Sequence, residues 1–455
     1  MNAAEQLQGK VKGTVVLPSD PAYEEVRKIW NAMIDRRPAV IVQCAEAGDV
    51  PVAMAFAREN GLELSIRGAG HNIAGNAICD GGLMIDFSAM QKVRVDAAKR
   101  RAYVEPGATL AIFDAAAQAH GLATPVGINS TTGIAGLTLG GGFGWLTRQY
   151  GLTIDNLVSA DLVLANGTKM RASATENADL FWAIRGGGGN FGVVTQFEFA
   201  LHPVGPDVLA GLMVFPFNQA KQVLVRYRDF VESIPAELNV WVVLRQAPPL
   251  PFLPVAVHGK EVVVVPIFYT GATEQGLKLI DPLRKFGSAL GEHLGVQPYV
   301  QWQQAFDPLL TAGARNYWKS HNFTELSDGM LDITIEFAGK LPTPQCEIFL
   351  GLLGGASSRL PSDATAYGPR DAKFVVNVHG RWDETAQDEA GIAWSRAFFH
   401  AAAPYASGGA YVNFMTAEED DRVAAAYGSN YERLVKIKRQ YDPENIFHLN
   451  QNIKP

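Results

Sequence analysis

The sequence has little of what marks a disulfide-rich, membrane-spanning or secreted protein. Its three cysteines (Cys44, Cys79 and Cys346) are an odd number at unrelated spacings, so neither a disulfide framework nor a zinc site is predicted. No run of about 18 apolar residues exists, and the longest, Val262–Tyr269, is strand-sized. Residues 1–10 lack the basic and apolar regions of a secretory signal. These absences predict a soluble protein of the reducing cytoplasm, without a membrane span.

An excess of basic residues is also missing. Lys and Arg number 39 against 46 Asp and Glu, which gives a net charge of −7. Nucleic acid is therefore not expected as a partner, because phosphate binding needs a basic surface. The composition is globular, with 47% hydrophobic and 19% charged residues, and 455 residues predict two or three domains. Nothing in the sequence indicates an oligomeric state.

The first 65 residues alternate helix and strand patterns. Pro21 suits a first helical position, and apolar residues then recur on one face of a helix that is predicted to end at Pro38. A strand (39–42), a helix (49–60) and a second strand (62–66) are predicted to follow. This second strand leads directly into a glycine-rich stretch.

The pattern of predicted helices and strands changes twice in the remaining chain. Residues 81–202 combine short strands with dense glycine, and Asn166-Gly167 between two strand patterns is a hairpin signal. Residues 205–409 contain a long amphipathic helix (218–234) and extended runs that fit antiparallel strands backed by helices. A further helix is predicted at 431–439. The predicted fold class is α+β.

Three glycine clusters, at residues 67–72, 133–144 and 186–192, are candidates for binding a phosphate or a flat ring. Glycine allows backbone N–H groups to approach such a ligand closely because it has no Cβ. The third cluster contains a formal G-x-G-x-x-G pattern. A dinucleotide fingerprint needs a strand before this pattern and a helix after it. The predicted order here is the reverse, which favours a tight turn over a nicotinamide site.

The other two clusters belong to a wider pattern. Arg67-Gly68-Ala69-Gly70-His71-Asn72 resembles the first pyrophosphate loop of the vanillyl-alcohol oxidase superfamily, in its berberine-bridge-enzyme-like branch with a PCMH-type FAD-binding domain. Residues 127–144 resemble the second flavin loop of that branch, and residues 185–195 resemble its following glycine turn. Tyr411-Val412-Asn413-Phe414 and residues 442–452 resemble its closing segment. The resemblance covers almost the whole chain.

This resemblance implies a two-domain flavoprotein with a split FAD-binding domain. Residues 1–204 would form its main part and residues 410–455 would complete it, while residues 205–409 would form an antiparallel-sheet substrate domain backed by helices. The pyrophosphate of FAD would lie along residues 68–72, and no metal is implied. The residues implied at the FAD are Arg67, Gly68, Ala69, Gly70, His71, Asn72, Asn129, Thr132, Gly133, Gly136, Gly140, Gly141, Gly142, Gly144, Gly192, Val193, Val194, Asn413, Asn450 and Asn452.

Three positions bear on how the flavin is held and reoxidised. His71 matches the family histidine that bonds to the 8α-methyl group of the isoalloxazine, although a lone histidine in a glycine loop also fits a hydrogen bond to phosphate. Asn129 stands where the family has a second tether, a cysteine, and asparagine cannot form the thioether. A single covalent link at His71 is therefore predicted. Thr132 matches the oxygen-gating position and is nearly isosteric with valine, which favours reoxidation by O₂.

The catalytic base is less well marked. The family reads Tyr-x-Asn-Tyr near its end, and Phe414 replaces the second tyrosine, which often serves as the base. Tyr411 is a candidate catalytic residue, with a structural role as the alternative. Asn377 and His379 alternate on one face of a predicted strand. Of these two, His379 titrates near neutral pH and is the candidate base.

The sequence thus predicts an FAD-dependent oxidase that takes a hydride from a small molecule onto flavin N5, with O₂ as the acceptor. The missing tyrosine and the aromatic-rich middle domain favour a bulky aromatic, amine or secondary-metabolite substrate. A sugar or oligosaccharide oxidase is the alternative. A flavin-binding protein without oxidase turnover is a further alternative.

Overall fold

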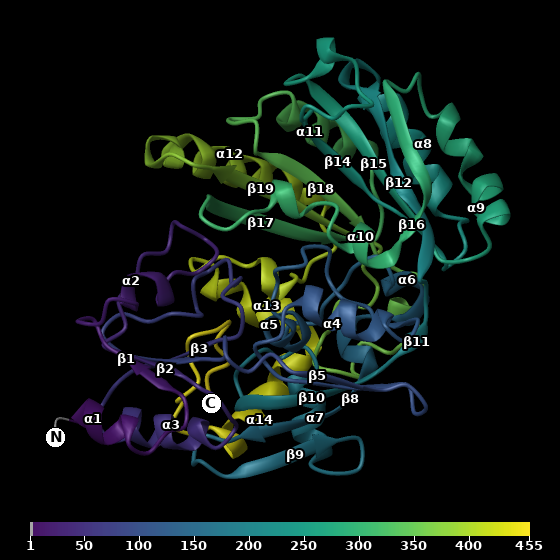
Figure 1. The fold of residues 1–455 in the computed structure, drawn as a ribbon. Coiled ribbons are helices and arrows are strands. Elements are labelled where there is room, and N and C mark those ends of the chain that lie inside the picture. Colours follow the sequence, from purple (N-terminus) through teal and green to yellow (C-terminus); the bar gives the residue numbers. More distant parts are fainter. Residues whose placement is uncertain (1–2) are drawn as a thin grey trace.

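The computed structural model describes residues 3–455, which form two layers that lie against each other (Figure 1). The lower layer in Figure 1 holds the N-terminal part of the chain, and the upper layer holds its middle part. The C-terminal part returns to the lower layer, so that both chain ends lie there. The predicted α+β class, with a large antiparallel sheet backed by helices, is confirmed. The domain boundaries at residues 204 and 410 stay a prediction.

The N-terminal part forms a small mixed sheet. Its strand order is β1 (Thr14–Val16), β2 (Val40–Gln43), β4 (Leu83–Asp86), β3 (Leu64–Arg67), with β1 antiparallel and the others parallel. Helices α1 (Ala3–Gln8) and α3 (Asp49–Glu59) pack beside it. The predicted strand–helix–strand succession from residue 39 to 66 is confirmed. The parallel arrangement sends the chain out of β3 directly into the first glycine loop.

The helix predicted to end at Pro38 is wrong beyond its first turn, because only α2 (Tyr23–Val26) is helical. The following backbone bonds to other segments instead of to itself. The Trp30 N–H donates to the Gly70 carbonyl (3.1 Å), and the Trp30 indole N–H donates to the Leu310 carbonyl (3.0 Å). The apolar residues of this segment therefore lie between the glycine loop and the upper layer.

A five-stranded antiparallel sheet forms the centre of the lower layer. Its order is β5 (Val93–Asp96), β6 (Arg101–Val104), β10 (Val193–Ala200), β8 (Leu157–Val163), β9 (Lys169–Ser173). The predicted hairpin at Asn166-Gly167 joins β8 to β9, and Gly167 has the positive φ of +84° that this turn requires. Two short strands, β7 (Leu122–Ala123) and β11 (His202–Pro203), pair separately.

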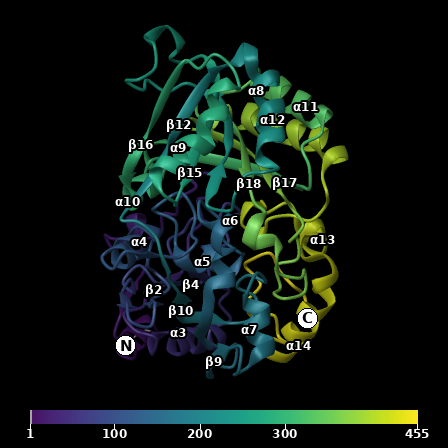
Figure 2. The same ribbon diagram turned by 90° about the vertical axis from the view of Figure 1, so that its right-hand side faces the viewer.

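Helices flank this central sheet and the glycine loops. They are α4 (Leu110–Gln118), α5 (Ile134–Leu139), α6 (Thr147–Tyr150), α7 (Ala178–Ile184), α13 (Val423–Tyr427) and α14 (Tyr431–Tyr441). Helix α14 packs against α7 in the lower layer, as the side view shows (Figure 2). Because α7 precedes the third glycine cluster and β10 follows it, the reversed order predicted there is confirmed.

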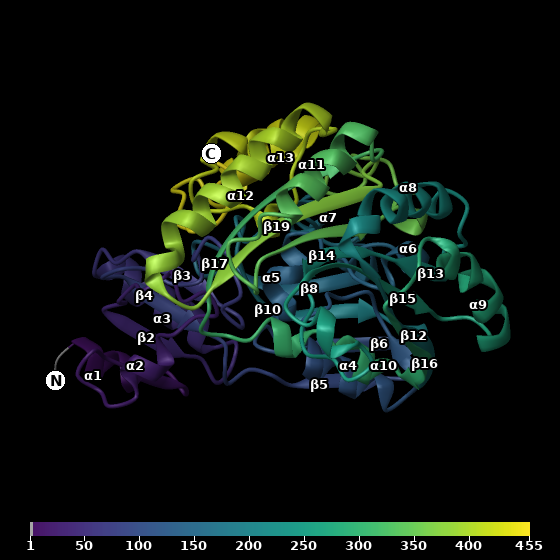
Figure 3. The same ribbon diagram turned by 90° about the horizontal axis from the view of Figure 1, so that it is seen from above.

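The upper layer is built on one large antiparallel sheet. Its order is β16 (Gly291–Pro298), β12 (Asp207–Pro216), β15 (Glu261–Tyr269), β14 (Val242–Gln246), β18 (Glu347–Leu352), β19 (Phe374–Trp382), β17 (Arg315–Phe323), with β13 (Leu238–Val240) beside β15. Seen from above, helices α8 (Ala220–Val231), α11 (Asp328–Ala338) and α12 (Asp388–Ala402) cover its outer face (Figure 3). Helix α9 (Thr273–Ile280) lies beside β12, and α10 (Tyr299–Gln303) reaches α4 of the lower layer.

A buried ion pair holds the chain end against the third glycine cluster. Lys438 and Asp442, one turn apart on and just after α14, are fully buried and lie 2.6 Å apart. The Lys438 ammonium also donates to the carbonyls of Asn190 (2.9 Å) and Phe447 (2.9 Å). Asp442 accepts the backbone N–H of Phe447 (2.9 Å). This network places the last residues beside the glycine turn.

Two further features of the described residues concern membrane-spanning helices and the cysteines. Among residues 3–455, no helix combines the length and the apolar character that a bilayer crossing needs. Cys44, Cys79 and Cys346 are buried and free. Burial raises the pKa of the Cys44 thiol, which keeps it protonated.

We predict that Lys438→Met lowers the free energy of unfolding by about 3–5 kcal/mol, because it leaves the Asp442 carboxylate buried without a partner. Urea unfolding of the purified protein measures this change. The matched control is Lys436→Met on the exposed face of α14, which is expected to stay within about 0.5 kcal/mol of the unsubstituted protein. Equal stability of the two variants would contradict the role of the pair.

Candidate active site

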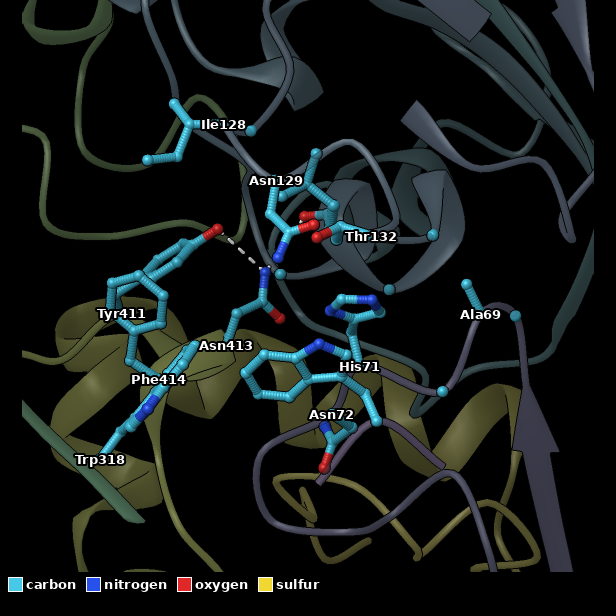
Figure 4. Close-up of a pocket in the computed structure, with 18 of the residues that line it drawn as sticks. Ala69, His71, Asn72, Ile128, Asn129, Thr132, Trp318, Tyr411, Asn413 and Phe414 are labelled. Carbon is cyan, nitrogen blue, oxygen red and sulfur yellow. Dashed lines mark hydrogen bonds between the residues drawn. The ribbon is translucent and has the colours of Figure 1, made fainter. Parts of the chain in front are cut away.

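One large pocket lies between the two layers. The glycine loops and the chain end form its lower side, and the inner face of the large sheet forms its upper side. Figure 4 shows His71 near the loop of Asn129 and Thr132, and it shows Tyr411 and Phe414 on the opposite side of Asn413. The pocket therefore brings together segments that are far apart in the sequence.

Most of the predicted site residues line this pocket. They are Gly68, Ala69, Gly70, His71, Asn72, Asn129, Thr132, Gly133, Gly136, Gly140, Gly192, Val193, Val194, His379, Tyr411, Asn413 and Asn450. Six others lie outside the lining, namely Arg67, Gly141, Gly142, Gly144, Asn377 and Asn452. The cofactor-binding or catalytic roles expected for these six stay predictions.

Close packing explains the position of three of these glycines. A Cβ at Gly144 would lie 1.9 Å from the Val126 carbonyl oxygen, and one at Gly142 would lie 2.2 Å from the Thr153 hydroxyl. A Cβ at Gly141 would lie 2.9 Å from the Tyr367 ring. These glycines let the second loop fold closely against protein atoms.

Arg67 positions the first glycine loop through contacts outside the pocket lining. Its guanidinium lies 2.6 Å from the buried Asp86 carboxylate and also donates to the carbonyl of Lys28 (3.0 Å). Burial raises the pKa of Asp86, but the bonds from Arg67 and Ser88 outweigh it and hold that pKa below its ordinary value. The positive charge of Arg67 is thus paired with the Asp86 carboxylate within the protein.

The first glycine loop fits the pyrophosphate of FAD. Among the described residues, 3–455, none accepts a hydrogen bond from the backbone N–H groups of residues 68–72. Successive free N–H groups in a glycine-rich turn form a concave site for anions. Because protein N–H groups are seldom left without a partner, this loop is suited to phosphate oxygens.

His71 is held at the pocket wall by two neighbours. Its ring stacks on Trp30 at a centroid distance of 5.0 Å, and its Nε2 lies 3.0 Å from the Thr131 hydroxyl. Burial lowers the pKa of His71 to about 3, against a weaker opposing effect of a hydrogen bond with the Thr131 backbone. The imidazole is therefore neutral near pH 7 and has one nitrogen with a free lone pair.

Tyr411 lines the pocket, but its hydroxyl makes hydrogen bonds to other groups of the protein. It accepts hydrogen bonds from the Gly142 N–H (3.2 Å) and the Asn413 amide (3.0 Å, Figure 4). Burial raises the pKa of Tyr411 to about 12 despite these bonds. A phenol with this pKa stays protonated near pH 7, so the geometry favours the structural alternative for Tyr411.

His379 on β19 has the geometry of a base. Its ring stacks on Trp318 at 4.4 Å, and its Nδ1 lies 2.9 Å from the Glu347 carboxylate on β18. The other nitrogen, Nε2, is buried without a hydrogen-bond partner among the described residues. Asn377, two positions earlier, is fully buried in the sheet and lies outside the pocket lining.

Glu347 and Arg245 are site residues that the sequence reasoning missed. Arg245 on β14 donates to Glu347 at 2.8 Å. Burial raises the pKa of Glu347, but Arg245 and His379 outweigh it and keep the pKa below its ordinary value. The register Glu347↔His379 between β18 and β19 brings them together, and only the alternation of residues in β18 could have indicated it.

Comparison with known proteins places this site in a family. A family model described as FAD binding domain matches residues 38–173, and one described as berberine and berberine like matches residues 410–454. The chain is 33% identical to an FAD-linked oxidoreductase of Dictyostelium discoideum over 98% of this chain and 95% of that protein. The chain belongs to the berberine-bridge-enzyme-like family of FAD-linked oxidoreductases. It is therefore an enzyme of that class, with FAD as its cofactor.

Solved structures of two oxidases have the same fold. 6-Hydroxy-D-nicotine oxidase from Arthrobacter nicotinovorans matches with a TM-score of 0.87 and 28% identity over 98% of each chain. Xylooligosaccharide oxidase from Myceliophthora thermophila matches with a TM-score of 0.86 and 25% identity over 100% of this chain and 99% of that one. The fold therefore occurs in both a 6-hydroxy-D-nicotine oxidase and a xylooligosaccharide oxidase, and the substrate of this FAD-linked oxidoreductase must be argued from its own pocket.

We predict that Gly133→Ala lowers the affinity for FAD by about tenfold or more. A Cβ there would lie 2.8 Å from the Ala69 backbone nitrogen, so the two flavin loops must move apart, at a cost of about 1–3 kcal/mol. FAD titration into the flavin-free protein measures the affinity. Gly295→Ala on the edge strand β16 is the control, because its Cβ would meet nothing within 4 Å. Unchanged FAD affinity in Gly133→Ala would contradict the close approach.

Proposed function

We propose that this enzyme is an oxidase with FAD bound covalently at His71, and that His379 is its catalytic base for a bulky, largely apolar aromatic or amine substrate. The observation that carries the proposal is the buried Nε2 of His379 on the sheet wall of the pocket, which has no hydrogen-bond partner in the described part of the chain. When bound, FAD accepts a hydride from a substrate C–H at N5 and returns the electrons to O₂ as hydrogen peroxide.

The pair of His379 and Glu347 supports this role. A carboxylate next to Nδ1 favours the tautomer with its proton on Nδ1, which leaves the Nε2 lone pair for a substrate O–H or N–H. The same carboxylate stabilises the imidazolium that forms when the proton is transferred. Trp318 stacks on the ring and limits its rotation. The pair thus supplies the base that is absent at Phe414.

The upper side of the pocket supports a bulky apolar substrate. Its polar side chains are Arg245, Glu347 and His379, and these bond to one another. The other lining residues on this side are Leu212, Trp241, Val243, Pro248, Leu250, Val264, Pro266, Phe306, Leu309, Leu310, Trp318 and Phe349. Such a wall binds an aromatic or alkyl group by burying apolar surface.

A sugar or oligosaccharide oxidase is the alternative. Sugar hydroxyls that enter a pocket must regain the hydrogen bonds that they lose to water, and the apolar wall provides few partners. Hydrogen peroxide release from a panel of aromatic amines and phenols against oligosaccharides distinguishes the two. Flavin that no compound bleaches would instead support a binding protein without turnover.

The proposal also includes reoxidation of the flavin by O₂ and a cytoplasmic location. Thr132 lines the pocket next to Gly133, at the position that the family resemblance relates to oxygen access. The free, buried cysteines support a cytoplasmic location, since oxidising compartments favour disulfides. Peroxide formation in air that matches substrate consumption supports O₂ as the acceptor.

We predict that His379→Gln lowers kcat/KM by about 10²–10⁴-fold, the usual contribution of general-base catalysis, with unchanged FAD content. The matched control is His400→Gln, on the exposed side of α12, which should leave both unchanged. Full activity of His379→Gln would rule out this base.

We predict that His71→Ala binds FAD without a covalent bond. Acid precipitation of the unsubstituted protein should leave the flavin in the pellet, and the intact mass should include FAD. The variant should release its flavin into the supernatant. Flavin that stays in the pellet of His71→Ala would place the tether elsewhere, and flavin released from the unsubstituted protein would contradict covalent binding altogether.

A further inference from the structure

A short chain of hydrogen bonds leads away from His71. The Thr131 hydroxyl lies 3.0 Å from His71 Nε2 and 2.7 Å from Asn129 Oδ1. Asn129 Oδ1 also accepts the Thr131 backbone N–H (3.1 Å), and Asn129 Nδ2 donates to the Leu310 carbonyl (3.2 Å). The chain therefore begins at a backbone carbonyl of the upper layer and ends at the imidazole.

Backbone groups fix the orientation of the Asn129 amide. In the opposite orientation, its NH₂ would face the Thr131 N–H and its oxygen would face the Leu310 carbonyl, so both contacts would be repulsive. Asn129 Oδ1 is thus the group that faces Thr131. An amide oxygen only accepts hydrogen bonds, so the Thr131 hydroxyl must donate its proton to it.

The position of the proton on His71 follows from this. A hydroxyl has one proton, and that of Thr131 points to Asn129. The contact with His71 Nε2 is a hydrogen bond only if Nε2 carries the proton and Thr131 accepts it. Since the imidazole is neutral, its lone pair is then on Nδ1, to which no residue in the described range 3–455 makes a hydrogen bond.

We propose that Thr131 and Asn129 are positioning residues that hold His71 as the Nε2–H tautomer and so present Nδ1 as the nucleophile for FAD. This inference rests on the covalent attachment proposed above. It assigns the residue in place of the second tether a new role, because Asn129 orients the remaining tether through Thr131. The stacked Trp30 ring limits rotation of the imidazole.

The attachment step balances with O₂ as its oxidant. A C–N bond forms between His71 Nδ1 and the 8α carbon, and one C–H bond of the 8α-methyl group and the Nε2–H bond break. Two electrons pass into the flavin ring and then to O₂, which takes up both protons to give hydrogen peroxide. Only the Nδ1 lone pair is required of the protein at the start of this step.

The upper layer stabilises this arrangement. Leu310 accepts from both the Asn129 amide (3.2 Å) and the Trp30 indole (3.0 Å). Ser130, between the two positioning residues in sequence, donates its backbone N–H to the Asp307 carboxylate (2.8 Å). The tautomer of His71 thus depends on docking of the 307–310 loop, and the experiment needs the full chain.

The test compares Thr131→Val and Asn129→Leu. Thr131→Val removes the acceptor for Nε2–H and should slow covalent attachment by about fivefold, the factor for one net hydrogen bond. Asn129→Leu frees the hydroxyl to donate to Nε2, which moves the imidazole proton to Nδ1, and should slow attachment by roughly tenfold or more. Thr131→Ser keeps the hydroxyl and should restore attachment. Thr175→Val, on an exposed loop, is the matched control.

Two measurements are made on each variant. Intact mass, followed over time after FAD is added to the flavin-free full chain, gives the rate of attachment. ¹⁵N NMR of the histidine rings of the flavin-free chain, with the His71 signals assigned by their loss in His71→Ala, gives the tautomer. The unsubstituted protein should show Nε2–H alone, Thr131→Val a mixture of tautomers, and Asn129→Leu mainly Nδ1–H. A merely structural role would not invert the tautomer.

The outcomes separate the two proposals. If the unsubstituted protein carries its imidazole proton on Nδ1, or if all variants share its tautomer and attachment rate, the positioning role is wrong while the covalent tether stands. If FAD binds without any covalent bond but the tautomers follow the expected order, the tether is wrong and the hydrogen-bond chain stands. A variant that fails to fold leaves the comparison to the other variant and Thr131→Ser.

Discussion

The side chain of Asn31 joins the two layers of the molecule at the edge of the flavin pocket. Its amide nitrogen donates to the carbonyls of Ile73 (3.2 Å) in the lower layer and Asn316 (2.9 Å) in the upper layer, and its oxygen accepts the Asn316 N–H (2.9 Å). Loss of one hydrogen-bond partner of this buried amide would destabilise the fold, because an unpaired polar group in the interior costs about 1–3 kcal/mol. The adjacent Trp30 therefore sits in one place, against His71.

The site depends on this docking more than on either layer alone. The glycine loops supply N–H groups suited to phosphate and hold the His71 imidazole, while the large sheet supplies His379, Glu347 and the apolar wall. A base on the sheet can act together with a flavin bound at the loops only if both line the same cavity. The hydrogen bonds through Trp30, Asn31 and Leu310 provide that constraint.

Local patterns explain which predictions from the sequence were right. The helix at 49–60 and the hairpin at Asn166-Gly167 depend on periodicity and turn chemistry within a few residues, and both are present. The segment up to Pro38 has helical periodicity too, but its backbone bonds to Gly70 and to the upper layer, and this long-range competition cannot be read from spacing. Glu347 was missed for the same reason, since its role depends on register with His379 in another strand.

The sequence by itself determined the family, the cofactor and the glycine loops, because these depend on short motifs whose backbone chemistry is local. It also determined what is absent, namely a cysteine at Asn129 and a second tyrosine at Phe414. Only the tertiary structure decided which residues surround these two positions. Hydrogen bonds between distant segments determine that the Asn129 amide reaches His71 through Thr131, and that Glu347 stands behind His379. Such pairings depend on how the layers dock, and no local pattern encodes that.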